Sequence, residues 1–128
     1  MAVFETPIVE PVAENFKKTI KEVKEQEGGT VSEENNVQVN DDNYDLIVLD
    51  KFYDEVINKG NEVYLYNFLS SELAIIGNTL YARNAYKFKK KEYQKYFGEK
   101  SWYNPTTSSQ NILTRNEEKL ANIIKKYE

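Results

Sequence analysis

The chain contains 128 residues, of which 40% are hydrophobic and 30% are charged, and its formal net charge is -4. A chain of this length accommodates one ordinary domain, or a small domain that carries a tail. Neither Cys nor His occurs in it, which excludes disulfides, thiolate metal sites, cysteine nucleophiles and every catalytic or zinc site that needs an imidazole. The chain as given also lacks a signal peptide and any apolar run of about 18 residues, so no membrane span is expected.

Charge is distributed unevenly along the chain. Residues 1–69 contain 6 Lys and 15 Asp or Glu, a net charge of -9, whereas residues 70–128 contain 11 Lys or Arg and 6 Asp or Glu, a net charge of +5. The two halves therefore have different electrostatic roles. An acidic tail on the same chain can compete with an external polyanion for the basic half.

Residues 1–43 offer few apolar side chains to a core. Three apolar residues recur at helical spacing from Phe16 onward and predict a short helix over 13–26, which ends at a pair of glycines. Residues 30–43 are rich in Ser, Asn, Asp and Glu, a composition typical of disordered linkers. Residues 1–43 are thus predicted to be a flexible acidic N-terminal segment, partly helical and partly disordered.

Residues 44–64 are predicted to lead into the domain as a helix. Their apolar residues recur at positions i, i+3, i+7 and i+10, and Gly60 stands where a helix stop is expected. The alternative is a hairpin that pairs 37–39 with 46–49. Residues 63–68 alternate between aromatic and aliphatic side chains, which fits either a short strand or a helical turn.

Residues 65–128 contain three helical patterns. The first covers about 71–86 and follows a pair of serines, either of which can act as its N-cap. The second begins near Lys89, carries aromatic residues toward the core and ends at Gly98. Both are expected to contribute to one core.

The third helix has the most clearly defined start. Thr114 and Glu117 form a capping box, in which each side chain bonds the backbone N–H of the other residue. The preceding residues, 101–110, contain Asn104-Pro105 and form a loop, since the residue before proline resists helical geometry. We predict the all-α class: a small three-helix C-terminal domain with an aromatic-rich loop.

Several blocks in this half follow a recognisable order. They are Glu72-Leu73, Asn78, Tyr81-Ala82-Arg83, Tyr86-Lys87-Phe88, Tyr96-Phe97, Trp102-Tyr103, Pro105, Leu113, Glu117 and Asn122. In order and spacing they resemble the YARHG domain, a bacterial module, over residues 65–128. The chain has Asn84-Ala85 in place of the signature His-Gly, and Gly77-Asn78-Thr79 where the family usually has Arg-Asn-Glu.

The resemblance implies a location and a fold more than an activity. It implies a bacterial protein that is extracellular or at the cell surface, often behind an anchor and a linker. We therefore expect a non-catalytic accessory or binding module whose ligand is unknown. The alternative is an intracellular or phage-borne structural protein that docks a partner protein through aromatic residues.

Most motif residues are expected to have structural roles. The stem of Arg83 is expected to pack on neighbouring rings while its head group bonds helix ends or carbonyls. Asn78 and Asn122 are expected to bond loop backbone. Trp102 is expected to plug a core that is too small to close without large side chains. A structural role is likewise expected for Tyr81, Ala82, Tyr86, Phe88, Tyr96, Phe97 and Pro105.

A lysine cluster with interleaved aromatic residues provides the candidate ligand site. We single out Lys89, Lys90, Lys91, Tyr93 and Tyr103 for an anionic ligand such as a cell-wall polymer. A solvated helix face is the commoner explanation of such a cluster, and a protein partner is the other candidate. Nucleic acid is not expected, because the pI of the chain is near 5.0.

No pattern in the sequence points to catalysis. Glu117-Glu118 and Asp41-Asp42 are adjacent pairs, and adjacent residues do not face each other on a helix. There is no glycine-rich phosphate loop, nucleophile elbow or metal-ligand spacing. We therefore expect neither enzymatic activity nor a cofactor or metal ion.

Overall fold

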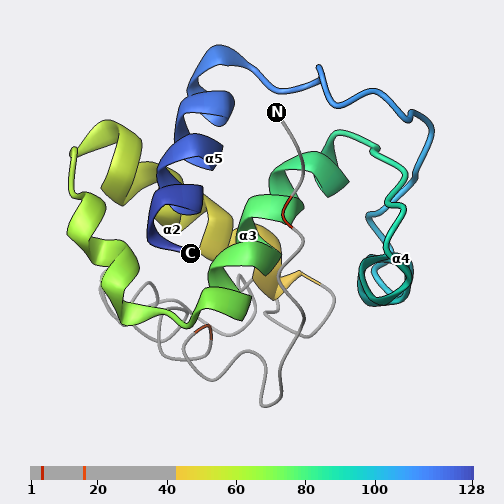
Figure 1. Cartoon of the computed structure of the whole chain (residues 1–128), viewed down its shortest axis with the longest axis horizontal. Coiled ribbons are helices and arrows are strands. Elements are labelled where there is room, and N and C mark those ends of the chain that lie inside the picture. Colours follow the sequence, from red (N-terminus) through yellow and green to blue (C-terminus); the bar gives the residue numbers. More distant parts are fainter. Residues whose placement is uncertain (1–3, 5–15, 17–42) are drawn as a thin grey trace, which may run out of the picture.

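A computed structural model of the chain describes Phe4, Phe16 and residues 43–128 (Figure 1). The elements are α2 (Tyr44–Phe52), the π-helical η2 (Tyr53–Asn58), the 3-10-helical η3 (Glu62–Asn67), α3 (Ser70–Arg83), α4 (Lys91–Gly98) and α5 (Arg115–Tyr127). No strand forms among the described residues, where one isolated bridge joins Tyr86 and Thr107. The predicted all-α class is confirmed.

The helix predicted after residue 43 forms, but in two geometries. α2 continues directly into η2, and the run ends before Gly60, whose φ of 71° is accessible to glycine without steric cost. The hairpin alternative is wrong, because residues 46–49 lie within α2. Its other strand, 37–39, lies outside the described residues, as do the predicted linker and most of the predicted N-terminal helix.

The ambiguous stretch at 63–68 is a 3-10 helix over most of its length and not a strand. η3 covers it up to Asn67, and the chain becomes extended at Phe68. Leu65 and Phe68 are buried, whereas Val63 and Tyr66 remain exposed. Residues 63–66 are all aliphatic or aromatic, so the sequence did not distinguish a 3-10 helix from a strand.

α3 is the central helix of the domain. Every residue from Ser71 to Ala82 is buried, and the helix packs against both α2 and α5 (Figure 1). A helix with one apolar face would leave its other face in water, so burial on all sides requires neighbours all around it. The polar residues within it, such as Asn78 and Thr79, are therefore enclosed by protein.

The N-terminus of α3 is capped by a carboxylate and not by a serine. Ser70 is the first residue of the helix, and the Glu72 carboxylate accepts a hydrogen bond of 2.8 Å from the backbone N–H of Leu69. This bond satisfies one of the donors that a helix start leaves without an intrahelical partner. The predicted serine cap is therefore wrong, although the start is correct to within one residue.

α3 ends three residues before the predicted limit. Its last residue is Arg83, and Ala85 then adopts the left-handed conformation with φ of 71°. The Asn84 side-chain amide donates a hydrogen bond of 2.7 Å to the carbonyl of Leu80, which caps this end of the helix. This turn stands at the Asn84-Ala85 position that departs from the YARHG signature, and the chain after it places Tyr86 and Phe88 in the core.

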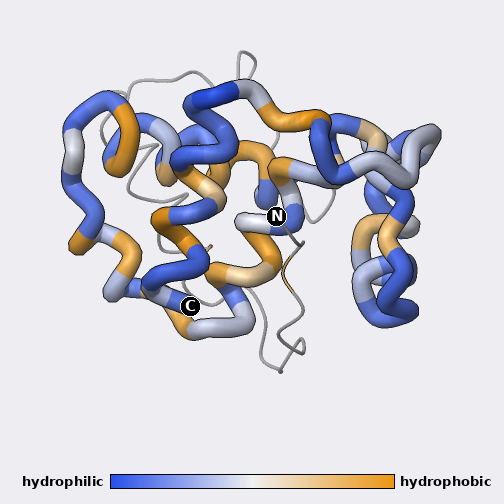
Figure 2. The backbone as a smooth tube through the Cα atoms, turned by 45° about the horizontal axis from the view of Figure 1, so that its top comes forward, coloured by the Kyte–Doolittle hydropathy of each residue, from blue (hydrophilic) through white to orange (hydrophobic). Residues whose placement is uncertain are grey.

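α4 stands apart from the other helices (Figures 1 and 2), and its aromatic rings stack on one another and on rings of its flanking loops. The buried rings of Phe88 and Phe97 stack with their centroids 5.0 Å apart, and Tyr93 stacks on Phe97 at 6.3 Å. Trp102 packs edge-on against Phe97 at 6.1 Å and is half-buried. We refer to residues 84–114, which carry α4 and its flanking loops, as the α4 arm.

Two phenylalanines of the acidic front segment belong to the core. Phe4 and Phe16 are both buried. The ring of Phe16 lies 5.7 Å from that of Tyr44 and 6.2 Å from that of Phe68. The prediction of a flexible segment over 1–43 did not anticipate these two anchors; residues 1–3, 5–15 and 17–42 lie outside the described part of the chain.

Candidate functional site

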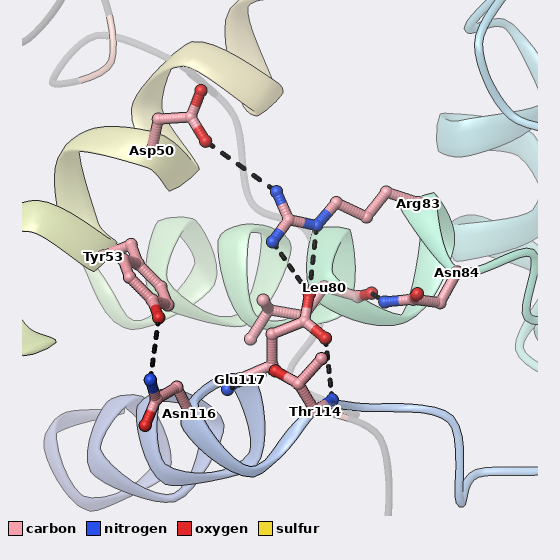
Figure 3. A network of polar contacts seen from close by, with 8 residues as sticks. All are labelled: Asp50, Tyr53, Leu80, Arg83, Asn84, Thr114, Asn116 and Glu117. Atoms are coloured by element: carbon pink, nitrogen blue, oxygen red, sulfur yellow. Dashed lines mark hydrogen bonds and ion pairs between the residues drawn. The ribbon is translucent and has the colours of Figure 1, made fainter.

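Arg83 of the Tyr-Ala-Arg motif joins three helices (Figure 3). Its guanidinium donates to the Glu117 carboxylate of α5 over 2.8 Å, and it lies 3.8 Å from the Asp50 carboxylate of α2. The partners of this head group are therefore carboxylates, whereas the sequence predicted helix ends or carbonyls. Because Arg83 ends α3, the group ties the central helix to both of its neighbours.

Glu117 binds with both of its carboxylate oxygens. One oxygen accepts the Thr114 backbone N–H at 2.8 Å, and the Thr114 hydroxyl accepts the Glu117 N–H at 3.1 Å, which confirms the predicted capping box. The other oxygen bonds Arg83. Burial by itself raises the pKa of Glu117, but the Thr114 N–H and the Arg83 guanidinium outweigh it and hold the pKa below its ordinary value.

A buried ion pair attaches the α4 arm to α2. The ammonium group of Lys100 lies 3.0 Å from the Asp45 carboxylate, and both side chains are almost completely buried. The Tyr96 hydroxyl donates to Asp45 at 2.8 Å, and the Tyr44 hydroxyl lies 3.2 Å from that of Tyr96. Lys100 also lies 4.4 Å from the centre of the Tyr44 ring, which adds cation–π attraction.

The tyrosine in this cluster is held as a proton donor. Burial raises the pKa of Tyr96, and the negative charge of Asp45 raises it further. Since the Tyr96 proton is directed at Asp45, the Tyr44 hydroxyl donates to the Tyr96 oxygen. The charged groups of the cluster are buried and bonded to one another, and they link the α4 arm to α2.

The residues singled out for an anionic ligand divide into two layers. Lys89, Lys90 and Lys91 are exposed at the start of α4, as are the neighbouring Lys87 and Lys95. Beneath them, the Tyr93 ring is fully buried. Tyr103 is half-buried and its hydroxyl donates to the carbonyl of Tyr86. The lysines form the accessible layer, and the two tyrosines belong to the aromatic cluster that supports it.

The motif residues lie mostly in the core. Tyr81, Ala82, Tyr86, Phe88 and Phe97 are buried. Asn78 is also buried and bonds backbone, though of residue 4 and not of a loop. By contrast, Asn122 and Pro105 are exposed. Asn122 lies in an open hollow of about 520 Å³ whose lining carries charges of both signs: Glu62, Arg115, Glu118, Lys119, Asn122, Ile123 and Lys126.

No group of metal-ligating side chains is assembled within the part of the chain that the structure describes. Over the same residues, no helix has both the length and the hydropathy needed to cross a bilayer.

The comparisons with known proteins agree with the motif geometry. The YARHG domain family matches residues 58–128, more than half of the chain. The chain belongs to the YARHG domain family. No curated protein and no solved structure matches it. The YARHG domain begins a few residues earlier than position 65, where the sequence blocks placed its start, so it includes the whole of η3.

Several residues that hold this YARHG domain together were not singled out from the sequence. Asp45 and Lys100 lie far apart in the chain, and no local sequence pattern marks them as partners. Phe4 is one apolar residue in an acidic tail. Gly77 carries the one signal that was visible, since a glycine inside a helix costs about 1 kcal/mol relative to alanine and points to a close contact.

Proposed function

We propose that this chain is a non-catalytic, extracellular or cell-surface accessory module of a bacterium, and that the lysine face of its YARHG domain binds an anionic polymer. The lysine face comprises Lys87, Lys89, Lys90, Lys91 and Lys95. The proposal is carried by one observation: these five lysines are all exposed within residues 87–95, which lead into α4 and run along it, next to aromatic rings that stack on one another. Repeating phosphates of a cell-wall polymer fit such a face by charge alone.

The charges of the lysine face are little neutralised by the protein itself. Lys90 lies 3.6 Å from Glu92, in a pair whose side chains are 41% and 36% exposed although the contacting Glu92 oxygen is buried. The other four lysines form no ion pair within the part of the chain that the structure describes. An exposed pair contributes at most about 1 kcal/mol, so an incoming polyanion can replace it. The face therefore retains most of its positive charge for a ligand.

The binding experiment compares two triple variants with the same change in charge. Lys89, Lys90 and Lys91 are replaced by Gln in one variant. The control replaces Lys59, Lys119 and Lys126, which are exposed elsewhere on the domain. Binding to immobilised poly(glycerol phosphate) is measured across a salt series. We expect the first variant to lose affinity by at least about tenfold, since each lysine near an anionic surface contributes on the order of 1 kcal/mol.

Wild-type binding should weaken steeply as salt rises, because the contacts are purely electrostatic. An equal loss in the control variant would show attraction by net charge alone and would reject the lysine face as the site. Exposure on the bacterial surface is tested separately by protease treatment of intact cells that carry the epitope-tagged protein. Protection from the protease would contradict the extracellular assignment.

A second candidate function, protein docking by an intracellular or phage-borne structural protein, is favoured by an exposed apolar patch around η3. Val63, Tyr66 and Leu69 are 59%, 73% and 52% exposed. Apolar and aromatic side chains at such exposure are typical of surfaces that bind other proteins. If the polymer does not bind at low salt, this patch becomes the stronger candidate.

A further inference from the structure

Phe4 is held on α3 by hydrogen bonds that depend only on its backbone. The Asn78 side-chain oxygen accepts the Phe4 N–H at 2.9 Å, and the Asn78 amide group donates to the Phe4 carbonyl at 2.8 Å. In an extended strand the N–H and C=O of one residue point to the same side, so a neighbouring strand bonds both. Here the single side chain of Asn78 takes the place of that neighbouring strand. Any residue in an extended conformation offers the same N–H and C=O groups to Asn78.

The ring of Phe4 occupies space that exists because residue 77 is glycine. A Cβ atom on Gly77 would lie 2.2 Å from one carbon of the Phe4 ring, far inside van der Waals contact. A glycine in a helix interior is unfavourable by about 1 kcal/mol relative to alanine. The ring's close approach therefore accounts for a residue that helix propensity disfavours. Asn78 can bond the backbone of any residue, whereas the space above Gly77 fits a flat aromatic side chain.

A residue of a second helix completes the contact. The ammonium group of Lys125, on α5, lies 5.2 Å from the centre of the Phe4 ring, within cation–π range. Two helices of the YARHG domain, α3 and α5, thus shape the contact with Phe4.

We infer that Gly77, Asn78 and Lys125 form a peptide-binding slot, the Phe4 slot, which recognises a phenylalanine in an extended segment of a partner protein and which Phe4 fills in cis. Asn78 binds the backbone, the space above Gly77 selects the ring, and Lys125 covers it. A partner segment with the same features competes with Phe4. This inference is independent of the lysine face, because the slot contacts are backbone hydrogen bonds and a buried ring.

A filled slot lowers the apparent affinity for any free peptide by the fraction of molecules in which the slot is open. The first experiment therefore uses the full chain with Phe4→Ala, which removes the ring. The probe is a fluorescent peptide with the sequence of residues 2–6, capped at both ends, and binding is followed by anisotropy. We expect the variant to bind this peptide at least about tenfold more tightly than the wild-type chain does.

Two further changes test the chemistry of the slot. The same peptide with Ala in place of Phe should show at least about a tenfold loss of affinity for the Phe4→Ala chain, since the ring is the buried group. The double variant Phe4→Ala/Gly77→Ala should lose binding to a similar extent, because its new methyl group occupies the ring's space. Alanine also favours the helix, so this variant is expected to fold. Phe4→Ala/Asn122→Ala, altered at an exposed site, should bind like Phe4→Ala.

Circular dichroism and thermal unfolding establish that each variant is folded. The inference is overturned if folded Phe4→Ala fails to bind the peptide, or if the Ala-containing peptide or the Gly77→Ala chain binds equally well. If Phe4→Ala does not fold, Phe4→Leu takes its place, because leucine fills less of the slot. Phe4→Leu should bind the peptide more tightly than the wild-type chain, and equal binding would overturn the inference.

Discussion

The helical core, made of α2, α3 and α5, and the α4 arm are stabilised by different kinds of side chain. In the core, helices pack directly against each other, and a charged group at the helix ends adds to that packing. The α4 arm stands apart in Figure 1; its aromatic rings stack on one another, and the Asp45–Lys100 pair and the Tyr96 hydrogen bond to Asp45 attach it to α2. Its stability therefore depends on a few large side chains and one buried charge pair.

The difference explains how the domain can present a charged helix. The long side chains of Tyr96 and Lys100 reach Asp45 of α2, while the rings of Tyr93 and Phe97 join the hydrophobic core. One face of α4 buries Tyr93 and Phe97, while the lysines remain in water. The attachment therefore depends on few residues. Substitutions of those residues should loosen the contact between the α4 arm and the core.

Breaking the buried ion pair should have the largest effect. Asp45→Ala leaves the Lys100 ammonium group without its carboxylate in the interior, and removal of one partner of a buried pair typically destabilises by about 3–5 kcal/mol. Urea unfolding measures the change. The matched control is Asp54→Ala, which breaks a solvent-exposed pair with Lys59 and should cost less than about 1 kcal/mol. Equal effects would show that Asp45 is no more important than a surface carboxylate.

Removing the charge of Glu117 tests the ion pair that joins α3 and α5 in the helical core. Glu117→Gln weakens the bonds to Arg83, and we expect a loss of about 1.5–3 kcal/mol at neutral pH, the range for hydrogen bonds to charged groups. Glu118→Gln, its exposed neighbour on α5, makes the same charge change and should cost less than about 0.5 kcal/mol.

The Glu117 contribution should also depend on pH. The folded protein lowers the pKa of this carboxyl group, so the ionised form is stabilised by folding. That stabilisation is fully present above the unfolded pKa of about 4.3 and fades as pH falls through the lower folded pKa. The difference in unfolding free energy between wild type and Glu117→Gln should therefore shrink in acid. A difference that stays constant below about pH 4 would contradict the assignment.

The smallest effect is expected at the turn that joins core and arm, and it has the opposite sign. Ala85 adopts φ of 71°, a conformation that costs an L-residue roughly 1–2 kcal/mol. Ala85→Gly removes that strain but gives the unfolded chain more freedom, worth about 0.4–1 kcal/mol. We expect a net gain of about 0.5–1 kcal/mol in thermal unfolding. Ala74→Gly, inside α3, should be destabilising instead.

Much of the local structure of this protein was predictable from its sequence. The Thr114–Glu117 capping box placed the start of α5, and Gly60 ended the helix that begins at Tyr44. The order of motif blocks identified the family. These features share a cause: a cap, a stop or a helical face is decided by residues within about one turn of each other, so their spacing is visible in the chain.

The tertiary structure decided which distant residues meet. Asp45 and Lys100, Arg83 and Glu117, and Phe4 and Asn78 come from separate parts of the chain, and nothing near each residue names its partner. The α4 arm contains six lysines. Five of them are exposed to solvent, and the sixth, Lys100, is buried. A charge can be buried only where folding supplies a carboxylate and closely packed rings, because desolvation must be offset by contacts that form all at once.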